Sequence, residues 1–470
     1  MAINFDALSA VITSVNDALW AYLLIGALIV CGLYFTVRTR FVQFTMVGEM
    51  FRQLFDASPP GKHKHISSFQ AFAVSVATRV GTGNLAGVAT AIAVGGPGAV
   101  FWMWIIAIVG AATAFVESTL AQLYKRPHSD SFVGGPAYYI SRGLHSKWMA
   151  ASFAVLITLT FGLSYNSIQS NTICGAMFNA FGFDKIIVGG IISAIALFIV
   201  FGGIQRIAHV SSILVPVMAI GYFILALVIV IMNIGMVPHI LRLIVESAFG
   251  IEQVAGGGLG MTVMTGVKRG LFSNEAGEGS APNVAATAHV SHPVKQGLIQ
   301  SLGVFTDTLL VCSCTAFVVL MSGLYTTDGM EGIELTQAAL QAQVGGWGTI
   351  FVAVAIFLFA FSSIIGNYYY GEANIRYLTN SKTVLFVFRL LSGGAFVLLG
   401  AVASFEFVWS LGDLFMALLT MCNLVAIVCL GKYVFRLLDD YRNKKRTGIK
   451  DPEFHREDLP EVADDLDSWD

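Results

Sequence analysis

The sequence carries little charge. Only 12% of its 470 residues are Asp, Glu, Lys or Arg, whereas 56% are hydrophobic and the mean hydropathy is +0.74. A soluble globular domain has about 25% charged residues. So low a charge content excludes an ordinary soluble protein and indicates an integral membrane protein embedded in a lipid bilayer. We expect no nucleic-acid partner.

The chain also lacks the common signatures of enzymes and metal sites. Its six cysteines include no C-x-x-C pair, which argues against a disulfide framework and a zinc site. No His is followed by Glu, neither Gly-Lys pair precedes Ser or Thr, and no G-x-S-x-G turn occurs. These absences exclude an H-E-x-x-H protease, a Walker A pump and a nucleophile-elbow hydrolase. We expect no enzyme activity, no catalytic residue and no cofactor.

Long apolar runs predict an all-α, polytopic membrane protein. No Lys or Arg precedes Arg38, and the first apolar run is long enough to span, so we expect no cleavable signal peptide. A short interfacial helix is predicted from Pro238 to Gly250. About eleven spanning helices are predicted, near residues 17–37, 66–95, 99–124, 149–180, 186–204, 208–233, 256–288, 295–324, 348–374, 383–402 and 407–431.

Lys and Arg lie mostly in alternate loops and in the C-terminal tail. The opposite loops carry only Lys185 and Arg242, and the longest of them carries Asp328, Glu331 and Glu334. The positive-inside rule therefore predicts an external N-terminus and a cytoplasmic C-terminus, in a plasma membrane such as a bacterial inner membrane. Residues 1–65 would form a first helix and a cytoplasmic loop. Residues 436–470 would form a charged cytoplasmic tail, mobile from Asp439 onward.

Between these segments, residues 66–233 and 234–435 would form two halves of about five helices each. A polar, glycine-rich break, Val80-Gly81-Thr82-Gly83-Asn84, interrupts the apolar run that opens the first half. An unwound stretch survives in a bilayer only where protein encloses it. Amides at such a break suit a carboxylate, and carbonyls such as those of Ala77 and Val80 suit a small cation. The alternative is a glycine contact for tight helix packing.

A second break, from Phe272 to Pro282, opens the second half. With an odd number of helices in each half, the two broken segments would run in opposite directions, as in an inverted-repeat transporter. Asn274 and the amides around Ala276 are its candidate ligands. A surface loop is the alternative interpretation, because Lys268 precedes the break.

Two further groups of polar residues lie in apolar helices. Ser362 and Ser363 either bond to their own helix carbonyls or offer hydroxyl oxygens to sodium, and Asn367 follows one turn later. Charges within the membrane need partners. The clearest are Arg79, Glu117, Asp307 and Arg389; an ion pair of Arg79 with Asp307 or Glu275 is the first interpretation, and gating or proton relay the second.

The stretch from Gly95 to Gly110, with its Phe-Trp-Met-Trp element, resembles the signature of the alanine/glycine:cation symporters, also called sodium:alanine symporters. The stretches Arg79 to Gly87, Phe272 to Gly277, Phe359 to Ser363 and Tyr368 to Glu372 are also similar. The resemblance implies a leucine-transporter-like fold and sodium-driven uptake of alanine or glycine. Many relatives have Trp where this chain has Asn367, which implies a roomier, more polar pocket here.

Within that family fold, sodium is expected at the carbonyls and hydroxyls of Ala77, Val80, Ser362 and Ser363, with Asn84 as a further ligand. The residues expected to bind the small neutral amino acid are Thr78, Gly81, Thr82, Gly83, Phe272, Asn274 and Asn367.

Several alternatives stay open. Proton coupling through Glu275, Glu278 or Asp307 is the nearest rival to sodium coupling, and serine or glutamine is the rival to alanine and glycine. A channel or receptor is less compatible, because polar residues gather around two breaks rather than along a continuous path. We expect a monomer.

Overall fold

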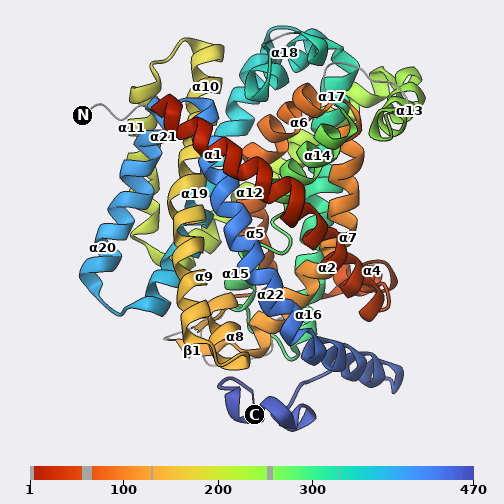
Figure 1. Ribbon diagram of the computed structural model, residues 1–470, viewed down its shortest axis with the longest axis vertical. Helices are drawn as coiled ribbons and strands as arrows, with labels where there is room; N and C mark the ends of the chain where they lie inside the picture. The colour runs from red at the N-terminus through yellow and green to blue at the C-terminus, as the bar shows by residue number, and fades with distance from the viewer. Residues whose placement is uncertain (1–4, 56–65, 129–130, 251–257, 328, 470) are drawn as a thin grey trace.

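The computed structural model describes residues 5–55, 66–128, 131–250, 258–327 and 329–469. This part of the chain is built almost wholly of helices (Figure 1). Two short apolar helices, Gly83–Gly95 and Lys185–Val200, accompany eight described helices that are long and apolar enough to cross a membrane. The predicted all-helical, multi-pass membrane fold is confirmed. The eight are Ile12–Arg38, Gly98–Leu123, Lys147–Phe181, Arg206–Met232, Pro293–Ser322, Trp347–Leu378, Lys382–Val402 and Phe405–Arg446.

The N-terminal part forms one long helical run and two short helices. The run begins earlier than the predicted 17–37, because residues from Phe5 onward are already helical. Its elements are α1 (Phe5–Leu19), η1 (Trp20–Leu24), α2 (Ile25–Arg38), α3 (Val42–Thr45) and α4 (Val47–Leu54).

The next part contains the first break and a small antiparallel hairpin, in which Arg126 lies opposite Val133. Its elements are α5 (Ser68–Arg79), η2 (Gly83–Gly87), α6 (Val88–Gly95), α7 (Gly98–Leu123), β1 (Arg126–His128), β2 (Ser131–Val133), α8 (Pro136–Gly143), α9 (Lys147–Leu159), η3 (Thr160–Tyr165), α10 (Asn166–Phe181), α11 (Lys185–Val200) and α12 (Gly203–Met232).

The last part contains the predicted interfacial helix, now α13, and the second break. Its elements are η4 (Ile234–Met236), α13 (Val237–Ala248), α14 (Leu259–Asn274), α15 (Ala281–Ala285), α16 (Pro293–Val304), η5 (Phe305–Cys312), α17 (Ser313–Ser322), η6 (Leu324–Thr326), α18 (Gly332–Val344), α19 (Trp347–Leu378), α20 (Lys382–Leu390), η7 (Leu391–Ala395), α21 (Phe396–Val402), α22 (Phe405–Arg446), η8 (Arg456–Asp458) and η9 (Pro460–Asp465).

Local sequence explains where the two broken helices start and stop. Ser67 and Gln70 form a capping box that begins α5, and Val80 is extended (φ −78°, ψ 92°), which ends it. At the second break Glu275 is left-handed, and Gly277 (φ +95°) and Gly279 (φ +79°) adopt positive φ values that glycine tolerates best. Pro282 then opens α15, where a missing N–H costs nothing.

The aromatic stretch that opens α7 anchors this helix to its neighbours. Trp102 Nε1 donates to the Ala248 carbonyl at the end of α13, and Trp104 Nε1 donates to the Ser313 hydroxyl. On the facing helix α14, a Cβ at Gly266 or Gly270 would come within 2.5 Å of α7 atoms. The small residues thus let α14 lie directly on α7, which fixes the position of the second break.

Three further features differ from the sequence-based predictions. The predicted helix 256–288 is two helices, α14 and the short α15; residues 256–257 lie outside the described residues. The acidic loop near Glu331 contains helix α18, which was not predicted. The tail is not a mobile extension, because α22 continues to Arg446 and Trp469 is buried.

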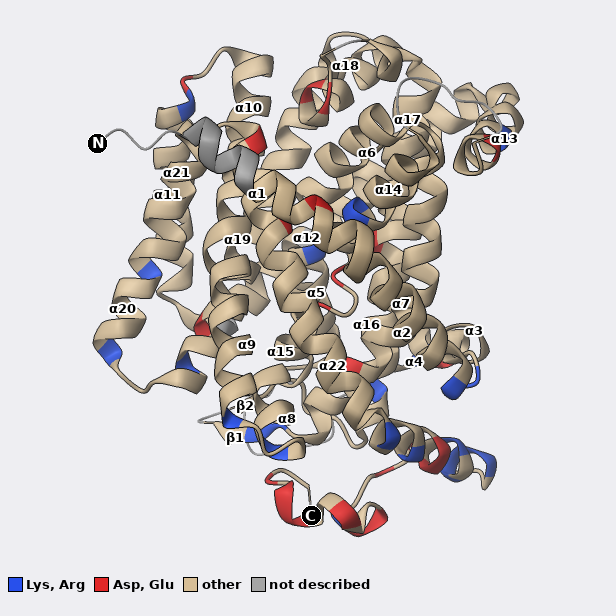
Figure 2. Ribbon diagram, in the orientation of Figure 1, with Lys and Arg blue, Asp and Glu red and all other residues tan. Residues whose placement is uncertain are grey.

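The charged residues are unevenly distributed along the molecule (Figure 2). Lys and Arg gather at the end that carries α4, α8 and the last turns of α22, and few lie at the opposite end. Lys62, Lys64 and Asp328, which entered the charge prediction, lie outside the described residues. We call the Lys- and Arg-rich end the basic end.

Candidate functional site

The first break lies between α10 and α19, and side chains already hold its free amides. The Gly81 N–H donates to Asn84 Oδ1 at 2.8 Å, and the Thr82 N–H donates to Gln169 Oε1 at 2.9 Å. All four residues are buried. These two amides are the ones that the sequence assigned to a carboxylate, and both now contact neutral amide oxygens.

The glycines of this break are in close contact with neighbouring helices. A Cβ at Gly81 would lie 2.3 Å from Ser363 Oγ and 2.9 Å from Gln169 Oε1, and one at Gly83 would lie 3.0 Å from the Phe272 ring. A side chain at Gly81 would therefore fill the point where the break, α10 and α19 meet.

The two serines of α19 meet the open end of α5. Ser362 Oγ and Ser363 Oγ lie 3.2 and 2.9 Å from the Ala77 carbonyl oxygen, and each also reaches the Phe359 carbonyl. In a continuous helix the Gly81 N–H would occupy the Ala77 carbonyl, but it has turned to Asn84. Val80 lies in the same break, with its N–H still bonded to Val76. Hard oxygen atoms of this kind suit a small cation.

Asn84 belongs to a second oxygen-rich cluster, on the other side of the break. Its Nδ2 donates to Asp307 Oδ1 at 2.7 Å, and Ser273 Oγ donates to Asp307 Oδ2 at 2.7 Å. Thr308 also donates to this carboxylate. Asn84 is therefore joined to η5 and lies in one cluster with Ser273 of α14, and no hydrogen bond connects it to Ser362 or Ser363 within the described residues.

Thr78 and Asn367 flank the contact between α5 and α19. The Thr78 hydroxyl donates to the Ser75 carbonyl at 2.8 Å and lies 3.0 Å from the Tyr370 hydroxyl. Gly366 packs on the Thr78 methyl group, since a Cβ there would lie only 2.4 Å away. Asn367 is 1% exposed, and neither its Oδ1 nor its Nδ2 has a hydrogen-bond partner among the described residues.

The second break is held by an acidic residue of α7. Glu117 accepts the N–H groups of Gly277 and Gly279 at 3.2 and 3.1 Å, and Asn423 Nδ2 donates to it at 2.8 Å. The Ala276 N–H donates to Asn274 Oδ1, while Asn274 Nδ2 has no partner in the part of the chain that the structure describes. The predicted amides of this break are thus already bonded within the protein.

A model of the sodium:alanine symporter family matches residues 5–456. The chain belongs to this family. This symporter is 53% identical over 444 residues to the probable sodium/glutamine symporter of Bacillus subtilis, covering 94% of this chain and 92% of that protein. It is 51% identical over 445 residues to the amino-acid carrier protein AlsT of the same organism (95% and 94% covered). It is 36% identical over 441 residues to the sodium/alanine symporter of Methanococcus maripaludis (90% and 95% covered).

Two solved structures share the fold of the symporter. The structure of MhsT with L-phenylalanine has a TM-score of 0.54 at 13% identity and covers 87% of this chain and 94% of its own. The manganese transporter of Eremococcus coleocola has a TM-score of 0.52 at 14% identity (79% and 81% covered). The expected leucine-transporter-like fold is confirmed, and the symporter is a transporter rather than an enzyme.

The buried charges of the symporter have partners that differ in part from the prediction. Arg79 donates to the Gln300 carbonyl at 3.3 Å, and no ion pair joins it to Asp307 or Glu275 within the described residues. The predicted ion pair of Arg79 with Asp307 or Glu275 was wrong, because the guanidinium group of Arg79 points from α5 toward α16. Arg389 instead pairs with Glu372 at 3.0 Å.

Sequence reasoning missed several residues that surround the first break. Tyr165 is the last residue of η3 and Gln169 follows one turn later in α10; the Tyr165 ring lies tilted against the Phe272 ring, with the ring centres 4.8 Å apart. The Trp409 ring of α22 is also tilted against Phe272, with the ring centres 4.8 Å apart, and Arg269 lies over the Trp409 ring and pairs with Asp413. The sequence signal that could have identified Tyr165 and Gln169 is their spacing of one turn within an apolar helix.

Proposed function

We propose that this protein is a sodium-coupled symporter that imports a neutral amino acid by alternating access, with the first break as its binding site. The observation that carries the proposal is the pair of amides at Gly81 and Thr82, which, among the described residues, are held only by the neutral side chains of Asn84 and Gln169. An amino-acid carboxylate makes stronger, charge-assisted bonds to such amides and can displace a neutral oxygen.

Sodium would bind beside the carboxylate, between α5 and α19. The ligands would be the Ala77 and Val80 carbonyls and the hydroxyls of Ser362 and Ser363. Both serine hydroxyls contact the Ala77 oxygen, at 3.2 and 2.9 Å, which brings three of these oxygens together. A cation there would take over oxygens that now bond to one another.

The substrate side chain would extend toward Asn367, one turn beyond Ser363. A buried amide without partners costs about 1–3 kcal/mol for each unsatisfied group. A side chain that itself carries an amide or hydroxyl would satisfy Asn367 Oδ1 and Nδ2, whereas alanine and glycine would not. Glutamine, followed by serine, is therefore our preferred substrate over alanine and glycine, and the relative named as a probable sodium/glutamine symporter supports this order.

Proton coupling is the second candidate, favoured by the fully buried Asp307 carboxylate with Asn84 and Ser273. A relative that is 44% identical is named as a putative sodium/proton-dependent alanine carrier. In this candidate Asp307 takes up a proton or a second cation when the substrate binds.

Membrane insertion would follow the charge pattern, with the basic end in the cytoplasm of a bacterial inner membrane. The two halves, 66–233 and 234–435, would move against each other around the binding site in a monomer.

The experiment is uptake of labelled glutamine and alanine into proteoliposomes that contain the purified protein. Sodium is replaced by choline at constant pH, and unlabelled alanine, glycine, serine and glutamine compete with the label. We expect saturable uptake that requires sodium and that glutamine inhibits about tenfold more strongly than alanine. Equal uptake in choline would refute sodium coupling, and stronger inhibition by alanine would refute the role of Asn367.

A further inference from the structure

The tail segment, residues 447–469, folds back over the basic end instead of extending away. The chain reverses at Gly448 (φ +91°), directly after α22. Its apolar side chains are then buried at intervals of three to five residues along the segment: Phe454, Leu459, Val462, Leu466 and Trp469. Figure 1 shows the C-terminus beneath α8 and the β1–β2 hairpin.

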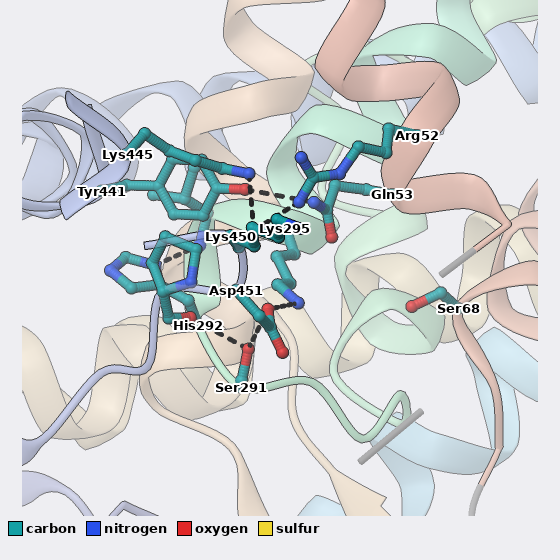
Figure 3. Close-up of polar contacts among 12 residues, drawn as sticks. Arg52, Gln53, Ser68, Ser291, His292, Lys295, Tyr441, Lys445, Lys450 and Asp451 are labelled. Carbon is teal, nitrogen blue, oxygen red and sulfur yellow. Dashed lines mark hydrogen bonds and ion pairs between the residues drawn. The ribbon is translucent and has the colours of Figure 1, made fainter. Parts of the chain in front are cut away.

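The first part of the tail segment binds residues 286–292, which we call the α15–α16 loop. The Phe454 N–H donates to the Ser291 carbonyl at 2.9 Å, and the Ser291 hydroxyl donates to Asp451 Oδ1 at 3.1 Å. Asp451 also forms an ion pair with Lys295 at the start of α16, and Arg52 donates to the Lys450 carbonyl. Figure 3 shows Ser291 and Lys295 converging on Asp451.

His292 strengthens this contact from the other side. Its Nδ1 accepts the Val294 N–H, and its Nε2 lies 3.2 Å from Asp440 of α22. Burial lowers the pKa of His292, in agreement with a neutral ring that donates from Nε2. The ring also contacts Phe454 edge to face. The α15–α16 loop is therefore held between α22 and the tail segment.

The last part of the tail segment is attached to the end of α7. Trp469 Nε1 donates to the Leu123 and Gln122 carbonyls at 3.0 and 3.2 Å. Lys125 Nζ lies 4.5 Å from the Trp469 ring centre and 4.2 Å from that of Phe132. Asp467 bonds to both Arg142 and Arg126. One segment thus connects α7, α8 and the α15–α16 loop.

The α15–α16 loop is also joined to the start of α5. Ile66 pairs with Ala288 in a parallel bridge, and the His289 N–H donates to the Ile66 carbonyl at 3.2 Å. Gln122 of α7 donates to the Ala288 carbonyl at 2.9 Å. The loop follows α15 directly. It therefore links the basic ends of both broken helices, and the tail segment fixes it to α7.

We propose that the tail segment is a latch that keeps the basic-end halves of the two broken helices, α5 and α15, closed. The inference rests on the proposed function in one respect: alternating access requires these halves to separate before substrate can leave at the basic end. Contacts that exist only in the closed state raise its population, and their loss shifts the equilibrium toward the open state. Undocking of residues 447–469 would then precede release.

The test is hydrogen–deuterium exchange of the full-length protein in lipid nanodiscs, without substrate, read by mass spectrometry. Asp451→Asn weakens the contact to the α15–α16 loop, and Trp469→Ala removes the anchor on α7. Glu461→Gln is the matched control, since it removes a tail carboxylate that pairs only with Arg436 among the described residues. Peptides that cover 66–79 and 281–292 are compared with peptides from α10.

We expect both latch variants to exchange about fivefold faster over 66–79 and 281–292, with α10 peptides unchanged and Glu461→Gln like the unaltered protein. Faster exchange confined to residues 447–469 would overturn the proposal, because the tail would have undocked without releasing the helices. Equal acceleration in the Glu461→Gln control would also overturn it. If the latch variants behave as expected but no sodium-dependent uptake is found, the proposed function fails and the latch stands.

Discussion

The two breaks resemble each other in sequence but are held in opposite ways. At the first break, the amides of Gly81 and Thr82 contact neutral oxygens of Asn84 and Gln169. At the second, a single carboxylate, that of Glu117, accepts the amides of two glycines and the side chain of Asn423. Hydrogen bonds to an ionised group are roughly twice as strong as those between neutral groups.

This difference separates a binding surface from an anchor. A substrate carboxylate can replace a neutral oxygen at the first break with a gain in bond strength. At the second break it would have to displace a carboxylate that is already fully bonded and buried. Glycine and polar residues in a membrane helix therefore mark an unwound stretch, and the charge of its partner decides whether that stretch can take a ligand.

The largest effect is expected from Glu117→Gln, which removes the anchor of the second break. The new NH₂ group cannot accept an amide N–H, so at least one buried donor loses its partner, at about 1–3 kcal/mol each. We expect a marked fall in the midpoint of thermal unfolding, measured on the purified protein in detergent. Glu278→Gln is the matched control, because Glu278 is equally buried but its carboxylate has, among the described side chains, only a 3.5 Å contact to the Tyr165 hydroxyl. An unchanged midpoint in Glu117→Gln would remove the distinction between the two breaks.

At each break the sequence predicted the unwound backbone but not the side chain from another helix that binds it. The break at Gly81 and the serines of α19 could be recognised because a polar group in a membrane helix must be hydrogen-bonded or enclosed by protein. Gln169 and Glu117 could not be assigned to the breaks in the same way. They reach the breaks through the packing of α10 and α7, which no local pattern specifies.

The tail segment was mispredicted for a related reason. Its many acidic residues favoured a solvated, mobile extension. Between the acids, however, Leu459, Val462, Leu466 and Trp469 recur every three to four residues, and all four are buried. That spacing is typical of a segment with one apolar face. The prediction of a mobile tail rests on the charge content alone and does not use this spacing.

The next largest effect is expected from Gln169→Leu at the first break. Once displaced from Thr82, the Gln169 side chain can turn its NH₂ group to the substrate carboxylate, and a hydrogen bond to a charged group contributes about 1.5–3 kcal/mol. We expect the half-saturation concentration for substrate uptake to rise by roughly tenfold to a hundredfold. Thr172→Val on the same helix, whose hydroxyl bonds only to the Ile168 carbonyl within the described part of the chain, should leave the half-saturation concentration unchanged. Tighter substrate binding in Gln169→Leu would mean that Gln169 only competes with substrate.

Ser363→Ala should act on sodium rather than on the amino acid. It removes one hydroxyl oxygen from the group around the Ala77 carbonyl. We expect the sodium concentration for half-maximal uptake to rise about tenfold, which corresponds to about 1.4 kcal/mol. Ser170→Ala, a buried serine of α10 bonded to the Val397 carbonyl, is the control. The assignment fails if both variants keep the sodium dependence of the unaltered protein.

The smallest effect, and the most specific, is expected from Asn367→Leu. Leucine is larger than asparagine and has no donor or acceptor, so it removes an amide whose two polar atoms have no partner in the described structure. The protein should become slightly more stable, because replacing an unsatisfied buried polar group with an apolar one is favourable. The preference for glutamine over alanine should decrease, because glutamine loses a hydrogen-bond partner for its side chain whereas alanine loses none. We expect the ratio of glutamine to alanine inhibition to fall by about five- to tenfold, read in the same competition assay. A stabilised variant with an unaltered ratio would place the substrate side chain elsewhere, and the first break would then bind the backbone of the amino acid without reading its side chain.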